Sequence, residues 1–220
     1  YNEKDNIAPL VGVLFTLGVA GLEVIVVDDN SPDGTANTVE ELKKNYPVHL
    51  IRRNQKLGLG SAYIAGFKKA LALGATHIFE MDADFSHAPA DVPRLLAAAE
   101  ADADPARSGA GLVVGSRRVP GGKIVGWNWR RHLTSASATW LARRLLKLKT
   151  KDVTAGFRCF RRRTLETIDL DAITSNGYAF QEELLYRTEQ AGFRVVEVPV
   201  TFTDRRHGKS KLSNKDVIEF

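Results

Sequence analysis

The chain has 220 residues, of which 44% are hydrophobic, so it is long and apolar enough to bury the core of an α/β domain and is not a disordered chain. Its single cysteine, Cys159, excludes an internal disulfide bond and a zinc site made of several cysteines. Its net charge of +5 is unevenly distributed, because residues 117–163 contain fourteen lysines and arginines but one acid, Asp152.

Helical and strand-like patterns alternate along the chain. Apolar residues at helical spacing predict helices over residues 5–18, 35–45, about 61–73, 90–103, 133–149 and 180–191. Short apolar runs predict strands over residues 23–29, 49–52, 76–81, 111–114, 152–160 and 194–202. This alternation predicts a Rossmann-like, doubly wound and mostly parallel sheet with helices on both faces.

Two carboxylates, Asp82 and Asp84, follow the apolar run of residues 76–81. Loops past the carboxyl ends of parallel strands are where such sheets bind ligands. The two side chains would repel each other unless a cation lay between them, and their oxygens suit Mg²⁺ or Mn²⁺. We expect a divalent ion that bridges a diphosphate; an ordinary Asp-rich turn is the alternative.

A glycine-bearing loop, residues 54–62, opens the helix that ends near residue 73. Backbone amides at such a helix start attract phosphate oxygens, although a Gly-x-Gly turn also serves plain packing. A later helix, residues 133–149, carries apolar residues on one side and arginines and Lys147 on the other. This pattern fits a helix at a membrane interface, or one packed on the sheet with its cations extended into solvent.

Eight segments in order resemble the family 2 glycosyltransferases of the GT-A fold and, among these, the dolichol-phosphate mannose synthases. The matching segments are residues 1–3, 26–35, 56–63, 81–89, 115–117, 154–158, 177–182 and 202–212. The family's first strand is missing from this fragment. The resemblance implies one GT-A catalytic domain over residues 1–220, with a nucleotide-binding half at 1–115 and an acceptor-binding half at 116–220 that contains the basic segment 117–163.

The resemblance also implies roles for individual residues. The nucleotide site would comprise Tyr1, Glu3, Val27, Asp29, Lys56, Asp82, Ala83, Asp84, Arg117, Arg205 and Lys211. The metal ligands would be Asp82, Asp84 and Ser86, which stands where some members have Gln. The catalytic set would be Asp82, Asp84, Arg117, Arg205 and Lys211. The acceptor phosphate would meet Arg117, Arg130, Arg131 and Ser210.

The implied reaction is inverting transfer of mannose from GDP-mannose to a polyprenyl (dolichyl) monophosphate, with Mg²⁺ or Mn²⁺ bound. A lipid phosphate is already an anion at pH 7, so this acceptor needs no general base. Glu182 and Glu183 lie where relatives that use hydroxyl acceptors place a base; for Glu182 the alternative is an acid on a helix surface.

Two other functions stay open. One is transfer from a UDP-glucose type of donor to undecaprenyl phosphate, and a more remote one is nucleic-acid binding by the basic segment. The resemblance implies no nucleic-acid partner. It implies instead a peripheral position on the cytoplasmic face of a membrane, or anchoring by a segment or a partner subunit outside this fragment.

Overall fold

The computed structural model describes residues 1–101 and 110–204. Its α-helices are α1 (Lys4–Phe15), α2 (Thr35–Leu42), α3 (Leu59–Ala72), α4 (Val92–Glu100), α5 (Trp129–Leu146), α6 (Arg162–Thr167) and α7 (Gly177–Gln190). Two 3-10 turns are η1 (Pro89–Asp91) and η2 (Leu170–Ala172). The strands are β1 (Val24–Asp28), β2 (Val48–Arg52), β3 (His77–Glu80), β4 (Leu112–Ser116), β5 (Lys123–Val125), β6 (Arg158–Arg161), β7 (Val195–Pro199) and β8 (Thr201–Thr203).

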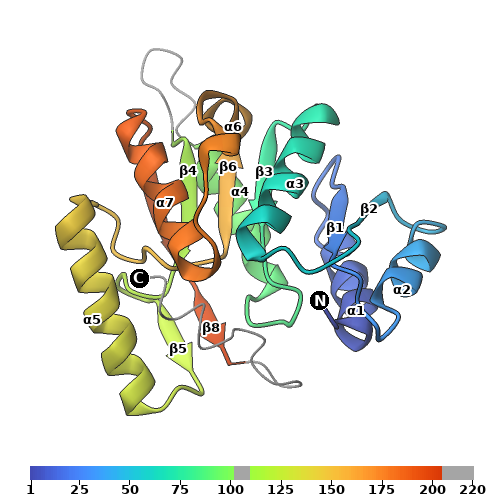
Figure 1. Cartoon of the computed structure of the whole chain (residues 1–220), viewed down its shortest axis with the longest axis horizontal. Helices are drawn as coiled ribbons and strands as arrows, with labels where there is room; N and C mark the ends of the chain where they lie inside the picture. The colour runs from blue at the N-terminus through green and yellow to red at the C-terminus, as the bar shows by residue number, and fades with distance from the viewer. Residues whose placement is uncertain (102–109, 205–220) are drawn as a thin grey trace.

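The central sheet has the strand order β3-β6-β4-β7 (Figure 1). Strand β6 runs antiparallel to both of its neighbours, whereas β4 and β7 are parallel. Strands β1 and β2 form a separate parallel pair, and so do β5 and β8. Three of these five pairings are parallel, and the two antiparallel ones both involve β6.

Helices cover both faces of the central sheet, as predicted. Leu112 and Val114 of β4 pack with helices α3 and α7 on one face. Val113, between them, points to the other face and packs with α4. This opposite orientation follows from the two-residue repeat of a strand, and it explains why β4 is apolar throughout.

The structure corrects two of the predicted strands and adds two elements. The predicted strand over 152–160 is wrong for most of its length, because β6 begins at Arg158 and the residues before it form turns and loop. The strand predicted over 194–202 is split into β7 and β8 at Val200, whose amide donates to the carbonyl of Ser116 while its own carbonyl accepts from Lys123. Strand β5 and helix α6 were not predicted.

Helix α5 lies along one side of the molecule (Figure 1). It begins at Trp129, four residues before the predicted start, where the side chain of Asn128 caps it by accepting from the amide of Arg131. Of its 18 residues, Thr139 and Ala142 are buried. Ala142 and Leu146 pack in the same core cluster as Leu112 and Val114 of β4, so one side of α5 does pack on the sheet as the second alternative states. Five of its large apolar side chains, Trp129, Leu133, Trp140, Leu141 and Leu145, are exposed on the rest of the helix.

Among the described residues, no helix combines the length and the apolar character needed to cross a membrane. The sequence analysis also predicted that the family's first strand is missing from this fragment, and this stays a prediction.

Candidate functional site

The loop after β3 presents the two predicted metal-binding carboxylates. Its backbone turns sharply at Phe85, where φ is 60°. Asp84 is buried, and its Oδ1 accepts from the amide of Ser86 at 3.0 Å. Ser86 is buried too, and its carbonyl accepts from the amide of Thr203. The loop is therefore held both by its own turn and by the end of β8.

Asp82 is held in place from two sides. Its Oδ1 accepts a hydrogen bond from the hydroxyl of Tyr63 at 3.3 Å, and its amide donates to Nδ1 of His87, also at 3.3 Å. Burial raises the pKa of the Tyr63 hydroxyl and lowers that of His87, so both groups stay neutral near pH 7. A neutral imidazole is needed here, because a protonated one has no lone pair to accept from the Asp82 amide.

Gly156 leaves room beside this carboxylate. A methyl group at its position would lie 3.8 Å from Cε1 of His87, 3.9 Å from Nε2 of Gln181 and 4.0 Å from Oδ1 of Asp82. Three polar side chains from β3's loop and α7 thus converge on one point that carries no side chain. Sequence reasoning placed Gly156 and Gln181 in matching motifs but assigned neither a role.

The donor set at this loop fits a magnesium-type ion. Among the described residues there is no group of three or more His, Cys, Asp or Glu side chains that could hold a metal. Mg²⁺ is commonly bound through one or two carboxylates, with substrate phosphates and water completing its shell. Asp82 and Asp84 meet that requirement, and the buried Ser86 lies two residues further along.

The first residues of the chain are fastened to the turn that follows β1. The amide of Asn2 donates to Ser31 Oγ at 2.9 Å, and the amide of Glu3 donates to Thr35 Oγ1 at 3.0 Å. Lys56 extends its ammonium over the ring of Tyr1, 5.7 Å from the centroid. The structure thereby brings Tyr1, Glu3 and Lys56, three residues of the predicted nucleoside site, together beside the end of β1.

Asp29, the residue directly after the same strand, already has a strong partner. Nε and Nη2 of Arg53 donate to its two carboxylate oxygens at 2.5 and 2.6 Å, and both side chains are nearly buried. Val27 lies against Gly66 of α3. Arg53 was missed by the sequence analysis, since nothing local shows that it pairs with a residue on the neighbouring strand.

The glycine loop before α3 is explained by packing. A Cβ at Gly58, where φ is +95°, would lie 2.5 Å from Oδ1 of Asn176, and one at Gly60 would lie 2.7 Å from the carbonyl oxygen of Ser175. Any side chain at either position would therefore collide with the start of α7. This supports the packing interpretation of the Gly-x-Gly turn.

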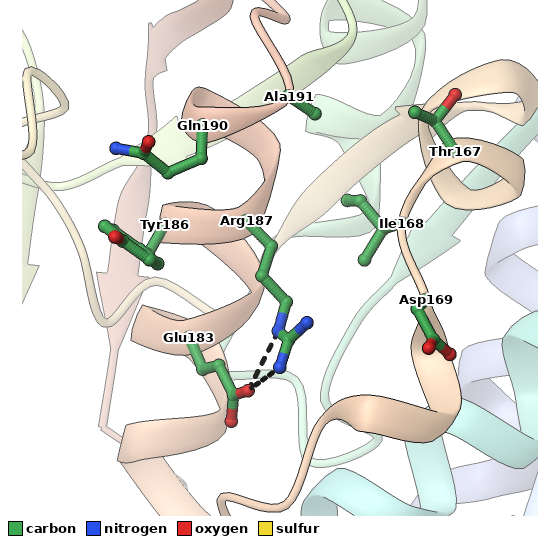
Figure 2. A pocket seen from close by; sticks show the side chains of 8 residues that line it. All are labelled: Thr167, Ile168, Asp169, Glu183, Tyr186, Arg187, Gln190 and Ala191. Carbon is green, nitrogen blue, oxygen red and sulfur yellow. Dashed lines mark hydrogen bonds and ion pairs between the residues drawn. The ribbon is translucent and has the colours of Figure 1, made fainter.

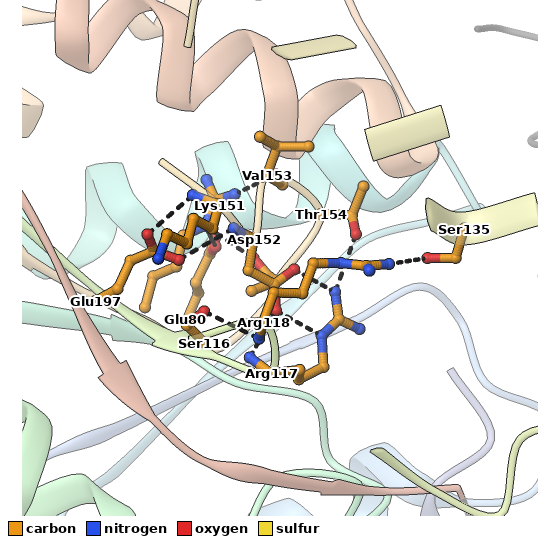
Figure 3. A network of polar contacts seen from close by, with 12 residues as sticks. Glu80, Ser116, Arg117, Arg118, Ser135, Lys151, Asp152, Val153, Thr154 and Glu197 are labelled. Carbon is orange, nitrogen blue, oxygen red and sulfur yellow. Dashed lines mark hydrogen bonds and ion pairs between the residues drawn. The ribbon is translucent and has the colours of Figure 1, made fainter. Parts of the chain in front are cut away.

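Arg117 is bound to a buried acid (Figure 3). Its Nε and Nη2 donate to the two carboxylate oxygens of Asp152 at 2.8 and 2.6 Å, and its amide donates to the same group at 2.7 Å. Nη2 also donates to Thr154 Oγ1 at 2.9 Å. Burial alone would raise the pKa of Asp152, but the hydrogen bonds and charge of Arg117 outweigh it and lower that pKa.

Aromatic rings surround the same guanidinium. The guanidinium of Arg117 lies over the rings of Phe202 and Trp127, at 5.4 and 5.8 Å from their centroids. The guanidinium of Arg131 lies over the Trp127 ring too, 4.2 Å from its centroid. Arg131 also pairs with Asp204 at 2.9 Å. Arg117 and Arg131 thus both lie over Trp127, and both already contact protein groups.

His87 connects this cluster to the carboxylates. Its ring lies edge-on to Phe202 at 5.6 Å and stacks on Phe157 at 5.2 Å. Arg130 is exposed and lies over Trp129 instead, 5.4 Å from that ring's centroid. Arg205, Ser210 and Lys211 lie outside the described residues.

Arg158, inside the core, holds the loop between Asp152 and β6 in place by hydrogen bonds. Its guanidinium is fully buried and donates to the carbonyls of Val153, Ala155 and Gln181 at 2.8, 2.8 and 2.9 Å. Glu80 lies 3.4 Å from its Nε, and burial raises the pKa of Glu80 to about 8 although Arg158 lowers it. Arg158 therefore belongs to the framework of the loop and not to the basic surface.

The two acids of α7 have different surroundings. Glu182 is buried, so the alternative that it is an acid on a helix surface is wrong, and burial raises its pKa to about 7 despite the charge of Arg158. Glu183 pairs with Arg187 at 2.7 Å in a surface pocket between α6 and α7 (Figure 2). That pocket shares no lining residue with the carboxylate loop.

A comparison with protein families matches residues 1–169 to glycosyl transferase family 2. The chain belongs to this family. It is 46% identical over 221 residues to the polyprenol monophosphomannose synthase of Mycolicibacterium smegmatis, covering 100% of this chain and 80% of that protein. It is also 46% identical over 214 residues to the undecaprenyl-phosphate mannosyltransferase of Micrococcus luteus, covering 97% of this chain and 84% of that one.

Solved structures agree on the fold of this family 2 glycosyltransferase. Glucosyl-3-phosphoglycerate synthase from Mycobacterium tuberculosis, in complex with Mn²⁺ and UDP-glucose, matches with a TM-score of 0.66 at 20% identity, over 99% of this chain and 72% of that one. Its complex with UDP matches with a TM-score of 0.64 at 21% identity, over 96% and 70%. The predicted α/β GT-A fold is confirmed.

Proposed function

We propose that this glycosyltransferase moves mannose from GDP-mannose to a polyprenyl monophosphate and inverts the anomeric carbon. The observation that carries the proposal is the 46% identity, over the whole chain, with a polyprenol monophosphomannose synthase. The second relative, named for mannosyl transfer to undecaprenyl phosphate, supports the same donor sugar and the same class of acceptor.

The donor would lie across the ends of β1 and β3. Tyr1, Glu3, Val27, Asp29 and Lys56 would hold the nucleoside, with Asp29 using the lone pairs that Arg53 leaves. The diphosphate would meet Ala83, and Asp82, Asp84 and Ser86 would hold Mg²⁺ or Mn²⁺. When bound there, the ion would stabilise the negative charge that develops on the departing diphosphate.

The acceptor phosphate would enter between the carboxylate loop and the start of α5. Arg130, Arg131 and Ser210 would bind it, and Arg131 would exchange Asp204 for the phosphate. Because Asp152 occupies two of its nitrogens, Arg117 would mainly orient this corner and contribute positive charge. Arg205 and Lys211 would neutralise the diphosphate.

No general base is needed in this scheme, because the attacking phosphate oxygen already carries negative charge. Glu182 does not act as a base here, and its buried carboxyl belongs to the packing of α7. Residues 1–115 would form the nucleotide-binding half and residues 116–220 the acceptor-binding half of one catalytic domain. A lipid acceptor places that domain at a membrane, and we propose its cytoplasmic face.

The test is a transfer assay with purified protein, Mn²⁺ or Mg²⁺, labelled GDP-mannose and a short polyprenyl phosphate. We expect a labelled product that partitions into organic solvent, and none when the metal is chelated. UDP-glucose and GDP-glucose serve as donor controls. Efficient transfer from UDP-glucose and none from GDP-mannose would refute the proposed donor.

A further inference from the structure

Helix α5 exposes five large apolar side chains: Trp129, Leu133, Trp140, Leu141 and Leu145. We call the exposed side of α5 that carries them the apolar surface of α5. Trp129, Leu133 and Trp140 are spaced by four and seven residues, which places them in one line along the helix. They are 69%, 61% and 67% exposed, and Leu145 is 70% exposed. Several large exposed apolar side chains on one helix indicate a site that contacts another molecule or a membrane.

The charges on the same helix indicate the chemistry of that partner. Residues 129–146 contain four arginines, at 130, 131, 143 and 144, and no aspartate or glutamate. Exposed aromatic and leucine side chains beside arginines suit the headgroup region of a bilayer with anionic lipid, where apolar groups reach the acyl chains and cations meet the lipid phosphates. A symmetric pairing of two copies through α5 would instead bring these arginines against one another.

The first turn of α5 is also connected to the carboxylate loop. Arg131 lies over Trp127, whose ring meets Phe202 edge-on at 5.9 Å. Phe202 in turn contacts His87, which accepts from the amide of Asp82. Side-chain contacts therefore connect the first turn of α5 to the proposed metal site, so a surface that binds α5 would lie close to that site.

We propose that the apolar surface of α5 lies on a bilayer containing anionic lipid and thereby presents the acceptor-binding corner to lipid phosphates in that bilayer. The second part rests on the proposed function, whereas the contact with the bilayer can be tested without it. The helix would lie parallel to the membrane, with Trp129, Leu133 and Trp140 at the boundary between headgroups and acyl chains.

The first test measures binding of the whole chain to vesicles of phosphatidylcholine mixed with phosphatidylglycerol, by flotation. We expect Leu133→Glu and Trp140→Glu each to lower the partition coefficient about tenfold or more, because each puts a charge where an apolar side chain would enter the bilayer. Leu73→Glu is the matched control, since it puts the same charge on an exposed leucine at the end of α3. It should bind like the parent chain.

Arg144→Gln combined with Lys147→Gln tests the charge contribution. We expect this pair to weaken binding to the mixed vesicles and to leave binding to pure phosphatidylcholine unchanged. Unchanged binding of both glutamate variants would overturn the proposal. A parent dimer that Leu133→Glu converts to monomer, with vesicle binding unaffected, would overturn it in favour of self-association.

A pair of transfer assays separates this inference from the proposed function. With a short polyprenyl phosphate in detergent, Leu133→Glu should transfer mannose as fast as the parent chain. With a long polyprenyl phosphate in mixed vesicles, it should be slower by the same factor as its partition coefficient falls. Absence of transfer by the parent chain would refute the function, while the flotation result would still decide whether α5 binds the bilayer.

Discussion

At the scale of single residues, Asp84 has two roles that one substitution can separate: it holds the turn of the carboxylate loop, and it would bind the metal. The Oδ1 of Asp84 accepts from the amide of Ser86, an interaction that an asparagine at this position can also make. Asp84→Asn therefore removes the charge and leaves the turn intact.

We expect Asp84→Asn to lower metal-dependent transfer about a hundredfold or more, because an ion held by a single carboxylate supplies less stabilisation to the departing diphosphate. The measurement is the transfer rate as a function of Mn²⁺ concentration. Asp91→Asn is the control, since Asp91 lies seven residues further on and pairs with Arg94. Normal turnover of Asp84→Asn would remove this residue from the proposed metal site.

Glu182 provides a prediction about pH. Its pKa rises from 4.5 in the unfolded chain to about 7 in the folded one, so folding favours the protonated form. Its contribution to stability is complete below pH 4.5 and is lost as the pH rises through about 7. Glutamine resembles the protonated acid and does not titrate.

We therefore expect Glu182→Gln to raise the free energy of unfolding by roughly 2 kcal/mol at pH 8 and to change it little at pH 4. Urea unfolding at the two pH values measures the difference. Transfer activity should survive, because the proposed mechanism uses no base. Loss of activity with a folded variant would instead support the hydroxyl-acceptor alternative.

At the scale of elements, two ion pairs fix the loops around β5, β8 and α5, but they differ in burial. The carboxylate of Asp152 is fully buried against Arg117, whereas Asp204 and Arg131 are 35% and 43% exposed. Removing one partner of a buried pair leaves a charge without compensation, while an exposed charge is solvated by water.

The same substitution at the two sites tests this difference. We expect Asp152→Asn to lower the free energy of unfolding by about 3–5 kcal/mol and Asp204→Asn by less than about 1 kcal/mol. Chemical denaturation near pH 7 provides both values. Because the pKa of Asp152 is lowered in the fold, the gap between the two variants should narrow as the pH falls below about 4. Equal losses of unfolding free energy at the two sites would show that the burial of Asp152 does not increase its contribution to stability.

At the scale of the whole molecule, the carboxylate loop contacts both the β1–β2 pair and the central sheet. Ala83 packs with the cluster formed by Ile7, Val11, Val39 and Val48, which holds α1, α2, β1 and β2 together. The strand before it, β3, pairs with β6 in the central sheet. A nucleotide bound at this loop would therefore contact both parts at once.

Ligand binding should then stabilise the molecule as a unit. We expect GDP with Mn²⁺, at about 100 times its Kd, to raise Tm by roughly 5–10 °C. Either component alone should do much less, because the metal needs the diphosphate to complete its ligands. Differential scanning fluorimetry measures the shift, and Asp84→Asn should lack it. An equal shift with GDP alone would mean that the nucleotide binds without the metal.

Much of the architecture could be predicted because it depends on local periodicity. Strands β1 and β3 and helices α3 and α7 were placed within a few residues of their true bounds, since a continuous apolar run or a helical repeat is a property of the segment itself. The Asp82–Asp84 pair was found for the same reason, as it directly follows a strand. The family resemblance added the order of the motifs.

Tertiary structure decided what depends on partners distant in the sequence. Arg117 was predicted as a phosphate ligand, but its carboxylate partner lies 35 residues away and emerges only when the loop before β6 folds over β4. The same holds for the pairing of β5 with β8, the burial of Glu182 and the solvent exposure of α5. Sequence alone determined most of the helices and strands and the position of the carboxylates along the chain, because neighbours along the chain set those properties. Which charges are paired and which apolar surface stays uncovered were settled by long-range packing.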